Sequence, residues 1–191
     1  MPIWSFIRHG ESQANAQGWF AGRVDTPLTP RGEQQAVAAR PHLHSVAIDR
    51  VMASDLERAR RTAELLLESS SLSIELVTPH LRERFCGDWE HREIAAIEAT
   101  GDMKIFRSWA GRPPGGESLR DVAARVLPFL AGVEDQRDTL VVAHGALIRT
   151  IVGLLDNTAP EEIGAWRPAN CEFVTRDVPL GRFGQLLATL P

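Results

Sequence analysis

Short apolar runs alternate with stretches of helical periodicity along the whole chain. Apolar runs bounded by polar or turn residues predict short buried strands. These runs lie at 3–7, 51–53, 73–77 and 139–143. Apolar positions three or four residues apart predict helices with one buried face. These periods cover 33–39, 56–67, 119–133 and 147–155. The alternation predicts an α/β fold, a three-layer α/β/α sandwich around a mostly parallel sheet.

Local signals predict where several elements begin. Thr29 followed by Pro30 predicts a helix start, because a threonine cap and a first-turn proline both favour one. The run from Ser54 to Glu57 fits a capping box, with its serine as the cap of the following helix. Near the end of the chain, the apolar residues at 171–175 and 183–190 predict two further strands.

One stretch has no sustained periodicity. Residues 84–114 mix charged and aromatic side chains, and a Pro-Pro-Gly-Gly run at 113–116 interrupts the chain before the 119–133 helix. We expect 84–117 to form an irregular cap with short helices over the functional site. The sequence contains no repeat or linker, so we expect residues 1–191 to form a single domain.

Composition and charge exclude several classes of protein. The chain carries 21 Lys and Arg against 25 Asp and Glu, a formal net charge of −4, so we expect no nucleic-acid partner. No apolar stretch reaches the ~18 residues of a membrane span, and the start lacks a signal-peptide pattern. We therefore expect no membrane partner and a cytoplasmic protein. Cys86 and Cys171 match no metal-ligand spacing, and we interpret them as reduced structural thiols.

Two of the predicted strands end in the same dipeptide, His-Gly. His9 follows the first strand directly after Arg8, and His144 follows a later strand. Arg58 falls in the first turn of the helix after the second strand, where backbone N–H groups favour an anion. Ligands of open α/β sheets bind beyond the carboxyl ends of the strands, so we expect these side chains to meet. Two arginines and two histidines without a carboxylate cluster indicate a phosphate site rather than a metal site.

The sequence around these residues resembles that of a known family. Residues 8–15, RHGESQAN, are similar to the RHGxxxxN signature of the histidine phosphatase superfamily, which contains cofactor-dependent phosphoglycerate mutases and many small phosphatases. Three further segments resemble the other motifs of this family, in the same order. They lie at 54–63, 81–90 and 141–145. The resemblance implies a phosphoglycerate mutase-like fold and catalysis through a phosphohistidine.

The resemblance also implies a role for each matching residue. His9 is the implied nucleophile, which attacks phosphorus through one ring nitrogen. The positive charges of Arg8 and Arg58 should disfavour the imidazolium form and keep this histidine neutral. Together with His144, these two arginines would hold the phosphoryl oxygens. The remaining members of the implied phosphate cradle are Asn15, Gly22 and Gly145.

Glu83 matches the acid of the third motif. It would donate a proton to the leaving oxygen and later take one from the water that hydrolyses the phosphohistidine. Asp88 and Glu90 belong to the same segment and are alternatives for this role. An acid on a surface loop is the non-catalytic alternative for Glu83. The resemblance implies no cofactor and no metal ion.

Departures from the mutase pattern favour a phosphatase. Cys86 stands where mutases commonly have a tyrosine, and His91 replaces a glycine. The interval from Glu83 to His144 is short and contains no adjacent arginine pair for a second phosphate. We therefore predict a phosphomonoesterase for a small phosphorylated metabolite. A phosphoglycerate mutase and a non-catalytic phosphate-binding module are the alternatives. The substrate stays open, as does the oligomeric state, for which a homodimer is one option.

Overall fold

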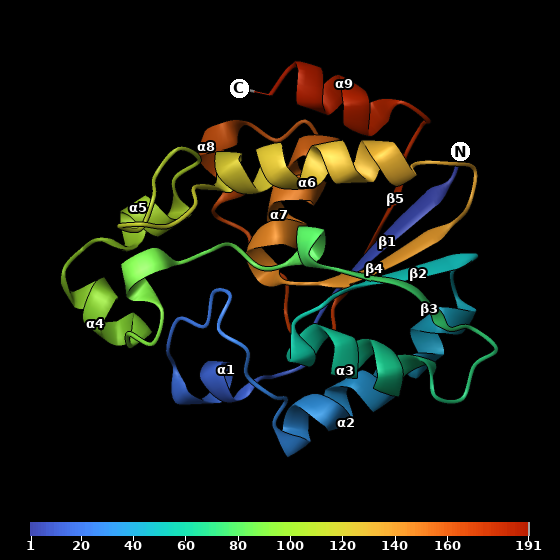
Figure 1. The fold of residues 1–191 in the computed structure, drawn as a ribbon, viewed down its shortest axis with the longest axis horizontal. Helices are drawn as coiled ribbons and strands as arrows, with labels where there is room; N and C mark the ends of the chain where they lie inside the picture. Colours follow the sequence, from blue (N-terminus) through green and yellow to red (C-terminus); the bar gives the residue numbers. More distant parts are fainter. Residues whose placement is uncertain (191) are drawn as a thin grey trace.

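A five-stranded sheet forms the centre of the computed structural model, which describes residues 1–190 (Figure 1). The strand order is β3-β2-β4-β1-β5. The strands are β1 (Ile3–Arg8), β2 (Arg50–Ser54), β3 (Ile74–Thr78), β4 (Thr139–Ala143) and β5 (Phe173–Asp177). The first four run parallel to one another, and β5 pairs antiparallel with β1. The mostly parallel sheet predicted from the sequence is confirmed.

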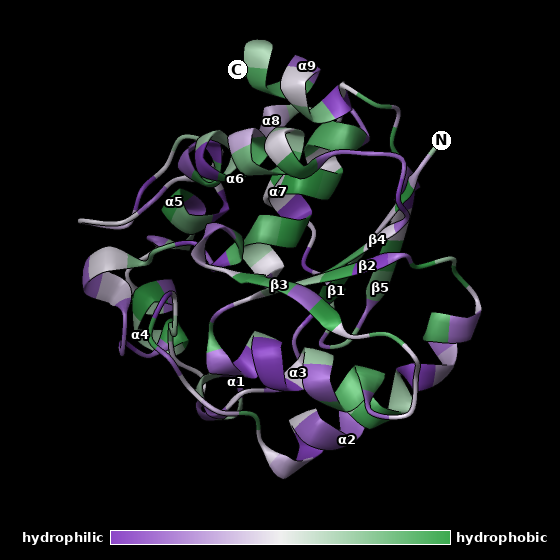
Figure 2. Ribbon diagram, turned by 45° about the vertical axis from the view of Figure 1, so that its right-hand side comes forward, coloured by the Kyte–Doolittle hydropathy of each residue, from purple (hydrophilic) through white to green (hydrophobic). Residues whose placement is uncertain are grey.

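Helices cover both faces of this sheet (Figure 1). One face carries α2 (Pro30–Ala38) and α3 (Glu57–Leu67), and the other carries α6 (Leu119–Val133), α7 (Gly145–Leu155) and α9 (Arg182–Ala188). Hydrophobic residues follow the strands, whereas α2 and α3 turn hydrophilic residues outward (Figure 2). A separate buried cluster fills the space on each face of the sheet. This arrangement is the predicted three-layer α/β/α sandwich in one domain, and it exposes the carboxyl ends of the parallel strands.

Short helices surround these strand ends. The segment 84–117 contains η3 (Gly87–Trp89), α4 (Ile94–Ala99) and α5 (Met103–Arg107), of which α4 and α5 lie to one side of the layers in Figure 1. Together with Phe20, its aromatic and aliphatic side chains form a separate small buried cluster. The short elements are α1 (Gln13–Gln17), η1 (Arg40–His44), η2 (Pro79–Leu81), η3 (Gly87–Trp89), α4 (Ile94–Ala99), α5 (Met103–Arg107) and α8 (Pro160–Ile163).

One predicted helix start is confirmed, and two other predicted elements are displaced by two residues. Thr29 caps α2 by accepting a hydrogen bond from the Gly32 N–H, and Pro30 is the first helical residue. The predicted strand at 171–175 is shifted two residues, to the range of β5. The helix predicted from residue 147 begins two residues earlier, at Gly145. Within the described part of the chain, no helix combines the length and the apolar character of a membrane span.

Two predictions are wrong. The apolar residues at 183–190 do not form a strand, because most of them belong to α9, where Phe183 and Leu186 are buried three positions apart. A short apolar run has no periodicity that separates strand from helix. The serine of the expected capping box does not cap α3, since that helix begins at Glu57 after Leu56. Instead, the Ser54 hydroxyl hydrogen-bonds the ring of His144.

Candidate active site

A cavity of about 460 Å³ opens at the carboxyl ends of the parallel strands. Most of the site residues expected from the sequence line it. They are Arg8, His9, Asn15, Gly22, Arg58, Glu83 and Gly145. They come from the end of β1, from α1, from the first turns of α3 and α7, and from the loops that hold Gly22 and Glu83. The structure therefore brings together residues separated by more than a hundred positions.

His9 follows β1 and is fixed by the backbone around it. Its N–H donates to the Ala143 carbonyl at 3.0 Å, which extends the pairing of β1 with β4. Its ring Nδ1 lies 2.7 Å from the Gly10 carbonyl oxygen, so Nδ1 carries the proton and donates there. Nε2 faces the Arg58 guanidinium, whose Nε–H donates to it at 3.3 Å. The lone pair that could attack phosphorus is thus on the nitrogen nearest the arginine.

The imidazole of His9 is neutral. Burial lowers its pKa well below the usual 6.5, and the charges of Arg58 and Arg8 lower this pKa further. The sequence predicted the effect of the two arginines. Burial, the larger cause, follows from the depth of His9, which is only 3% exposed. A neutral imidazole keeps the lone pair that nucleophilic attack requires.

Arg58 and Arg8 stay rigid through bonds to backbone carbonyls. Arg58 donates to Val24 at 2.9 Å and to Gly22 at 2.8 Å, which turns its Nε toward His9. Arg8 donates through Nη1 to Pro168 at 2.9 Å. Its Nε is buried and has no partner among residues 1–190. A buried donor without a partner is costly, and an anion in the cavity would satisfy it.

His144 lies behind this pair rather than on the cavity wall. Its ring packs edge-on against His9 with 5.1 Å between centroids, and it is fully buried. Nε2 contacts the Ser54 hydroxyl at 2.8 Å, whereas Nδ1 has no partner among the described residues. Burial, followed by the charge of Arg58, lowers the pKa of His144 well below 6.5. This second imidazole is therefore neutral as well.

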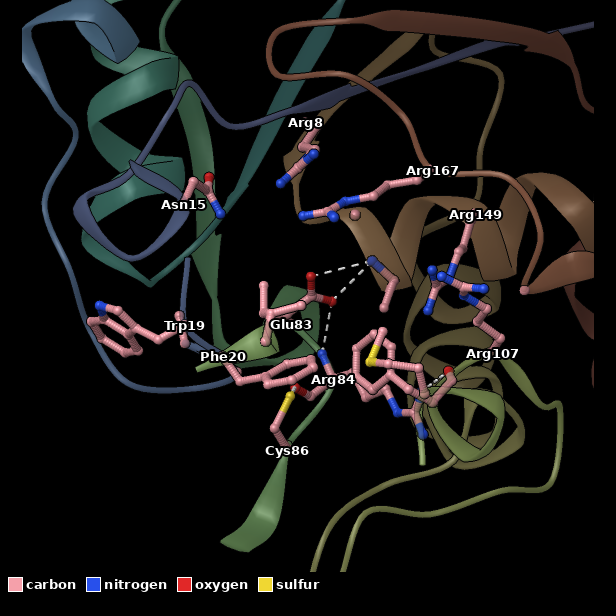
Figure 3. Close-up of a pocket in the computed structure, with 18 of the residues that line it drawn as sticks. Arg8, Asn15, Trp19, Phe20, Glu83, Arg84, Cys86, Arg107, Arg149 and Arg167 are labelled. Atoms are coloured by element: carbon pink, nitrogen blue, oxygen red, sulfur yellow. Dashed lines mark hydrogen bonds between the residues drawn. The ribbon is translucent and has the colours of Figure 1, made fainter. Parts of the chain in front are cut away.

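Glu83 places a carboxylate at the amino end of α7. Its oxygens accept hydrogen bonds from the backbone N–H groups of Ala146 and Leu147 at 3.1–3.3 Å. Oε1 also accepts from the N–H of Arg84 at 2.8 Å. The first turn of a helix presents such free N–H groups. The bonds fix Glu83 at the cavity, next to the start of the helix that follows His144 (Figure 3).

The two alternative acids do not reach the cavity. Asp88 is exposed on η3, and the Glu90 carboxylate accepts from the backbone N–H groups of Arg23 and Cys86. Glu98 is a second acid on the cavity wall, which the sequence did not single out, and it is exposed. Glu83 is the partly buried carboxylate of this site.

The remaining members of the expected cradle have different surroundings. The Asn15 amide oxygen accepts from the Ser12 N–H within the capping box of α1. Gly22 offers its carbonyl to Arg58 and has a φ of 50°, which favours glycine, and a Cβ there would collide with the Glu90 carboxylate. Gly145 begins α7 on the cavity wall.

Further residues near the cavity were not expected from the sequence. The Asn170 amide donates to the His9 carbonyl at 2.8 Å and fixes the backbone of that residue. Arg149 and Arg167 line the cavity, as does Arg107. Arg149 is the only charged residue of α7, GALIRTIVGLL, and a single charge in an apolar helix is a signal that could have identified it. Asn170 and Arg167 lie in a loop without periodicity.

The outer part of the cavity combines aromatic walls with arginines (Figure 3). Phe20 packs against Phe106, with 5.0 Å between ring centroids. Cys86 lies beside them, and burial raises the pKa of its thiol to about 12, so it stays protonated. Arg84 is fully buried and binds the backbone carbonyls of Glu117, Phe106 and Gly111, which ties the segment 84–117 together.

These features suit phosphoryl chemistry. Two arginines and a neutral histidine meet where backbone atoms hold each of them, and a carboxylate lies on the same cavity. Phosphoryl transfer depends mainly on such positioning and on positive charge around the phosphoryl oxygens. Within residues 1–190, no three His, Cys, Asp or Glu side chains gather closely enough to hold a metal ion.

Comparisons of the sequence agree with this geometry. The chain is 35% identical over 174 residues to the adenosylcobalamin/alpha-ribazole phosphatase of Escherichia coli strain K12. The aligned region covers 87% of this chain and 85% of that protein. It is 34% identical over 173 residues to the 2,3-bisphosphoglycerate-dependent phosphoglycerate mutase of Cytophaga hutchinsonii, covering 85% and 81%. The similarity to both kinds of relative, phosphatases and mutases, extends over most of this chain.

Solved structures of similar proteins have the same fold. A mycobacterial glucosyl-3-phosphoglycerate phosphatase in complex with VO3 superposes with a TM-score of 0.83 at 31% identity, over 92% of each chain. The alpha-ribazole phosphatase of Shigella flexneri superposes with a TM-score of 0.79 at 31% identity, over 93% of this chain and 91% of that one. The model of the histidine phosphatase superfamily (branch 1) matches residues 4–184. The chain therefore belongs to branch 1 of the histidine phosphatase superfamily.

Proposed function

We propose that the protein is a phosphomonoesterase that hydrolyses a small phosphorylated metabolite through a phosphohistidine at His9. The observation that carries this proposal is the neutral imidazole, with Nδ1 tied to the Gly10 carbonyl and Nε2 turned to Arg58 in the cavity. The phosphatases among the relatives support the reaction class.

In the first step, the phosphoryl group enters between Arg8 and Arg58. The unpartnered Nε of Arg8 donates to one phosphoryl oxygen. The Nε–H of Arg58 changes from His9 Nε2 to another oxygen, and the lone pair of Nε2 that this frees attacks phosphorus. As the bond to phosphorus forms, the ring becomes positive. The Nδ1–H bond to the Gly10 carbonyl then stabilises that charge.

His144 supports the same oxygens. The Ser54 hydroxyl oxygen already accepts from the Leu56 N–H at 3.3 Å, so its proton is available to His144 Nε2 at 2.8 Å. The imidazole proton is then placed on Nδ1, the buried ring nitrogen without a partner, which would donate to a phosphoryl oxygen that reaches past the cavity wall to the ring beside His9. In this role His144 acts as a neutral donor.

Glu83 completes both steps. In its protonated form it gives the proton to the leaving alcohol as the P–O bond breaks. The resulting carboxylate takes a proton from water, the water oxygen attacks the phosphohistidine, and the N–P bond breaks to return neutral His9 and inorganic phosphate. The backbone bonds from α7 hold the carboxylate at one place throughout.

Trapping the intermediate tests this function. Rapid acid-free quenching during turnover of p-nitrophenyl phosphate, followed by mass spectrometry, should locate one acid-labile phosphoryl group on His9. His9→Asn should carry none. A phosphoryl group on a serine or cysteine, or phosphate release by His9→Asn at the wild-type rate, would contradict the proposal.

A mutase is the second candidate, because relatives named as phosphoglycerate mutases match at similar identity. A mutase returns the phosphoryl group to the product, whereas a phosphatase passes it to water. When 3-phosphoglycerate is supplied with a 2,3-bisphosphoglycerate primer, NMR should show phosphate release with little 2-phosphoglycerate. Faster interconversion than release would favour the mutase. A non-catalytic module would show neither reaction.

We also propose that the reaction needs no metal ion, since Arg8 and Arg58 supply positive charge at the phosphoryl group. The cytoplasmic location, the homodimer option and the absence of a nucleic-acid partner stay predictions from the sequence.

A further inference from the structure

The peptide group that follows His9 is held at both of its polar atoms. The His9 carbonyl accepts from the Asn170 side-chain amide at 2.8 Å, and the N–H of Gly10 donates to the Thr62 hydroxyl at 3.0 Å. The two partners come from different parts of the chain, Asn170 from the loop before β5 and Thr62 from α3. Rotation of this peptide would therefore break a hydrogen bond at each end.

The Thr62 hydroxyl has a fixed direction. It is fully buried and donates to the carbonyl of Arg58, one turn earlier in α3, at 2.6 Å. Because a carbonyl can only accept, the hydroxyl proton lies toward Arg58, and the oxygen is left to accept from Gly10. A side chain without a hydroxyl would leave the buried Gly10 N–H without this partner, which is costly.

Gly10 also lies against the first turn of α2. A Cβ at this position would be 2.3 Å from the Gly32 carbonyl oxygen, so only glycine allows the approach. The Gly10 carbonyl accepts in turn from His9 Nδ1 at 2.7 Å. The position of the acceptor that holds the Nδ1 proton is thus set by the contacts of Gly10 with α2 and α3.

One face of α3 therefore serves both ring nitrogens of His9. Arg58 and Thr62 are four residues apart, which places them on the same side of the helix. Arg58 donates through Nε to His9 Nε2 at 3.3 Å. Thr62 acts on Nδ1 through the backbone of Gly10.

We infer that Thr62 and Asn170 are positioning residues, which together clamp the peptide between residues 9 and 10. This clamp holds the Gly10 carbonyl where it keeps the proton of His9 on Nδ1, and so leaves the Nε2 lone pair for attack on phosphorus. The inference rests on the proposed function in taking His9 as the nucleophile. Thr62 does not line the cavity, so its loss should lower the rate of phosphoryl transfer and leave phosphate binding unchanged.

Thr62→Val tests the clamp, because valine keeps the shape of threonine and removes the hydroxyl. kcat/KM should fall about 10- to 100-fold on propyl phosphate and p-nitrophenyl phosphate alike, since a small displacement of a reacting group costs this much. The inhibition constant of inorganic phosphate should stay within about twofold of the wild-type value. The side chains of Arg8 and Arg58 are held by other carbonyls and keep their places. Thr62→Ser restores the hydroxyl and should recover most of the lost activity.

Thr150→Val is the matched control. Thr150 is also fully buried in a helix, and its hydroxyl donates to the carbonyl four residues earlier, at Ala146, at 2.7 Å. Within residues 1–190 it accepts from no backbone N–H. The two substitutions remove the same bond within a helix, and only Thr62→Val also removes a bond to the end of β1. Thr150→Val should therefore keep kcat/KM within about twofold of the wild-type value.

The proton on His9 Nδ1 reports the clamp without turnover. In protein with ¹⁵N-labelled histidine, NMR should show this proton as a downfield signal that exchanges slowly with water and is missing from His9→Asn. In Thr62→Val the signal should move upfield and exchange at least about 10-fold faster, whereas Thr150→Val should keep it. If Thr62→Val does not fold, Asn170→Ala, at a half-buried loop position, should show the same change and carries the test.

These measurements separate the clamp from the proposed function. Wild-type kcat/KM in Thr62→Val, or a loss of activity with an unchanged Nδ1–H signal, would overturn the clamp. An equal loss in Thr150→Val, or the absence of a slowly exchanging signal from the wild-type protein, would overturn it as well. If the signal responds as expected but the wild-type protein hydrolyses no phosphomonoester, the clamp stands and the proposed phosphatase function fails.

Discussion

The cavity has two halves that are built in different ways. The inner half, here called the phosphate cradle, consists of Arg8, His9 and Arg58 with His144 behind them, and each comes from the end of a parallel strand or from the residues just after it. Backbone carbonyls fix the side chains of Arg8, His9 and Arg58 with bonds of 2.7–2.9 Å. The cradle is therefore organised before any ligand binds, as electrostatic catalysis requires.

The outer half is less tightly fixed. Its walls come from the segment 84–117, from α7 and from the loop around Arg167. Arg107 and Arg167 are exposed, and neither their side chains nor that of Arg149 form a hydrogen bond within residues 1–190. The difference indicates a division of labour, in which the cradle determines the reaction and the outer half determines the alcohol. Variants in each half should therefore change different quantities.

His9→Asn should give the largest effect. Removing the nucleophile should lower kcat by ~10⁴-fold or more on every phosphomonoester, since single nucleophile deletions in other enzymes cost this much or more. The loss should not depend on the leaving group, because all substrates use the same cradle. Steady-state assays with propyl and p-nitrophenyl phosphate measure it. If His9→Asn hydrolysed any substrate at the wild-type rate, that substrate would not depend on the phosphate cradle, and the assignment of the reaction to the inner half would be wrong.

Glu83→Gln should give the next largest effect, and here the leaving group matters. Alkyl phosphates should lose roughly 10²–10⁴-fold in kcat, because the departing alkoxide needs a proton. p-Nitrophenolate departs without one, so p-nitrophenyl phosphate should lose far less in the first step. Burst kinetics would follow that step separately from hydrolysis of the phosphohistidine.

Glu98→Gln is the matched control for Glu83→Gln, because it removes a carboxylate from the outer half of the same cavity. It should change alkyl and aryl esters to the same small extent. If Glu83→Gln slows both classes equally, Glu83 shapes the pocket and does not transfer the proton.

The two halves also differ in how far the sequence predicts them. The cradle was predictable because His9 and His144 end apolar runs, and the ends of parallel strands meet at one edge of a sheet. Arg58 followed from its place in the first helical turn after β2. These are local signals combined with one rule of topology.

The outer half depends on packing that no local pattern encodes. Arg167 and Asn170 lie in a loop whose course is set by the docking of α8 and β5 around it. Ser54 has the pattern of a helix cap, but a tertiary hydrogen bond to His144 takes its hydroxyl instead. Arg149 left a readable signal, since an isolated charge in a buried apolar helix needs a partner.

The histidines of the cradle make stability depend on pH. Both have pKa values lowered well below 6.5, chiefly by burial, so the folded protein leaves them neutral while the unfolded chain protonates them. The unfolded state therefore binds more protons as the pH falls below 6.5, and the free energy of unfolding decreases. For the two histidines, the loss should grow as the pH falls from 7 to 5.

Urea unfolding at a series of pH values measures this slope. Each histidine contributes a slope of at most about 1.4 kcal/mol per pH unit. His144→Asn removes one of the two, so the slope of this variant should be about half that of the wild type, whatever the stability of the variant at pH 7. Arg167→Gln, in the outer half, should leave most of the slope in place. A pH-independent free energy of unfolding between pH 7 and pH 5 would show that the cradle histidines titrate in the folded protein as they do in the unfolded chain.

Removal of metal ions should have the smallest effect, which is none. Two-metal phosphatases use cations to neutralise the phosphoryl oxygens and to activate the nucleophile. Here Arg8 and Arg58 bring fixed positive charges to the same oxygens, and His9 is a nucleophile that needs no activation because its imidazole is already neutral. Exhaustive dialysis against EDTA should leave kcat unchanged on both propyl phosphate and p-nitrophenyl phosphate. Activity that disappears and returns only with Mg²⁺ or Mn²⁺ would mean that the charges of the cradle are insufficient for the reaction. Arg8 and Arg58 would then not differ in function from the arginines of the outer half in the way described above.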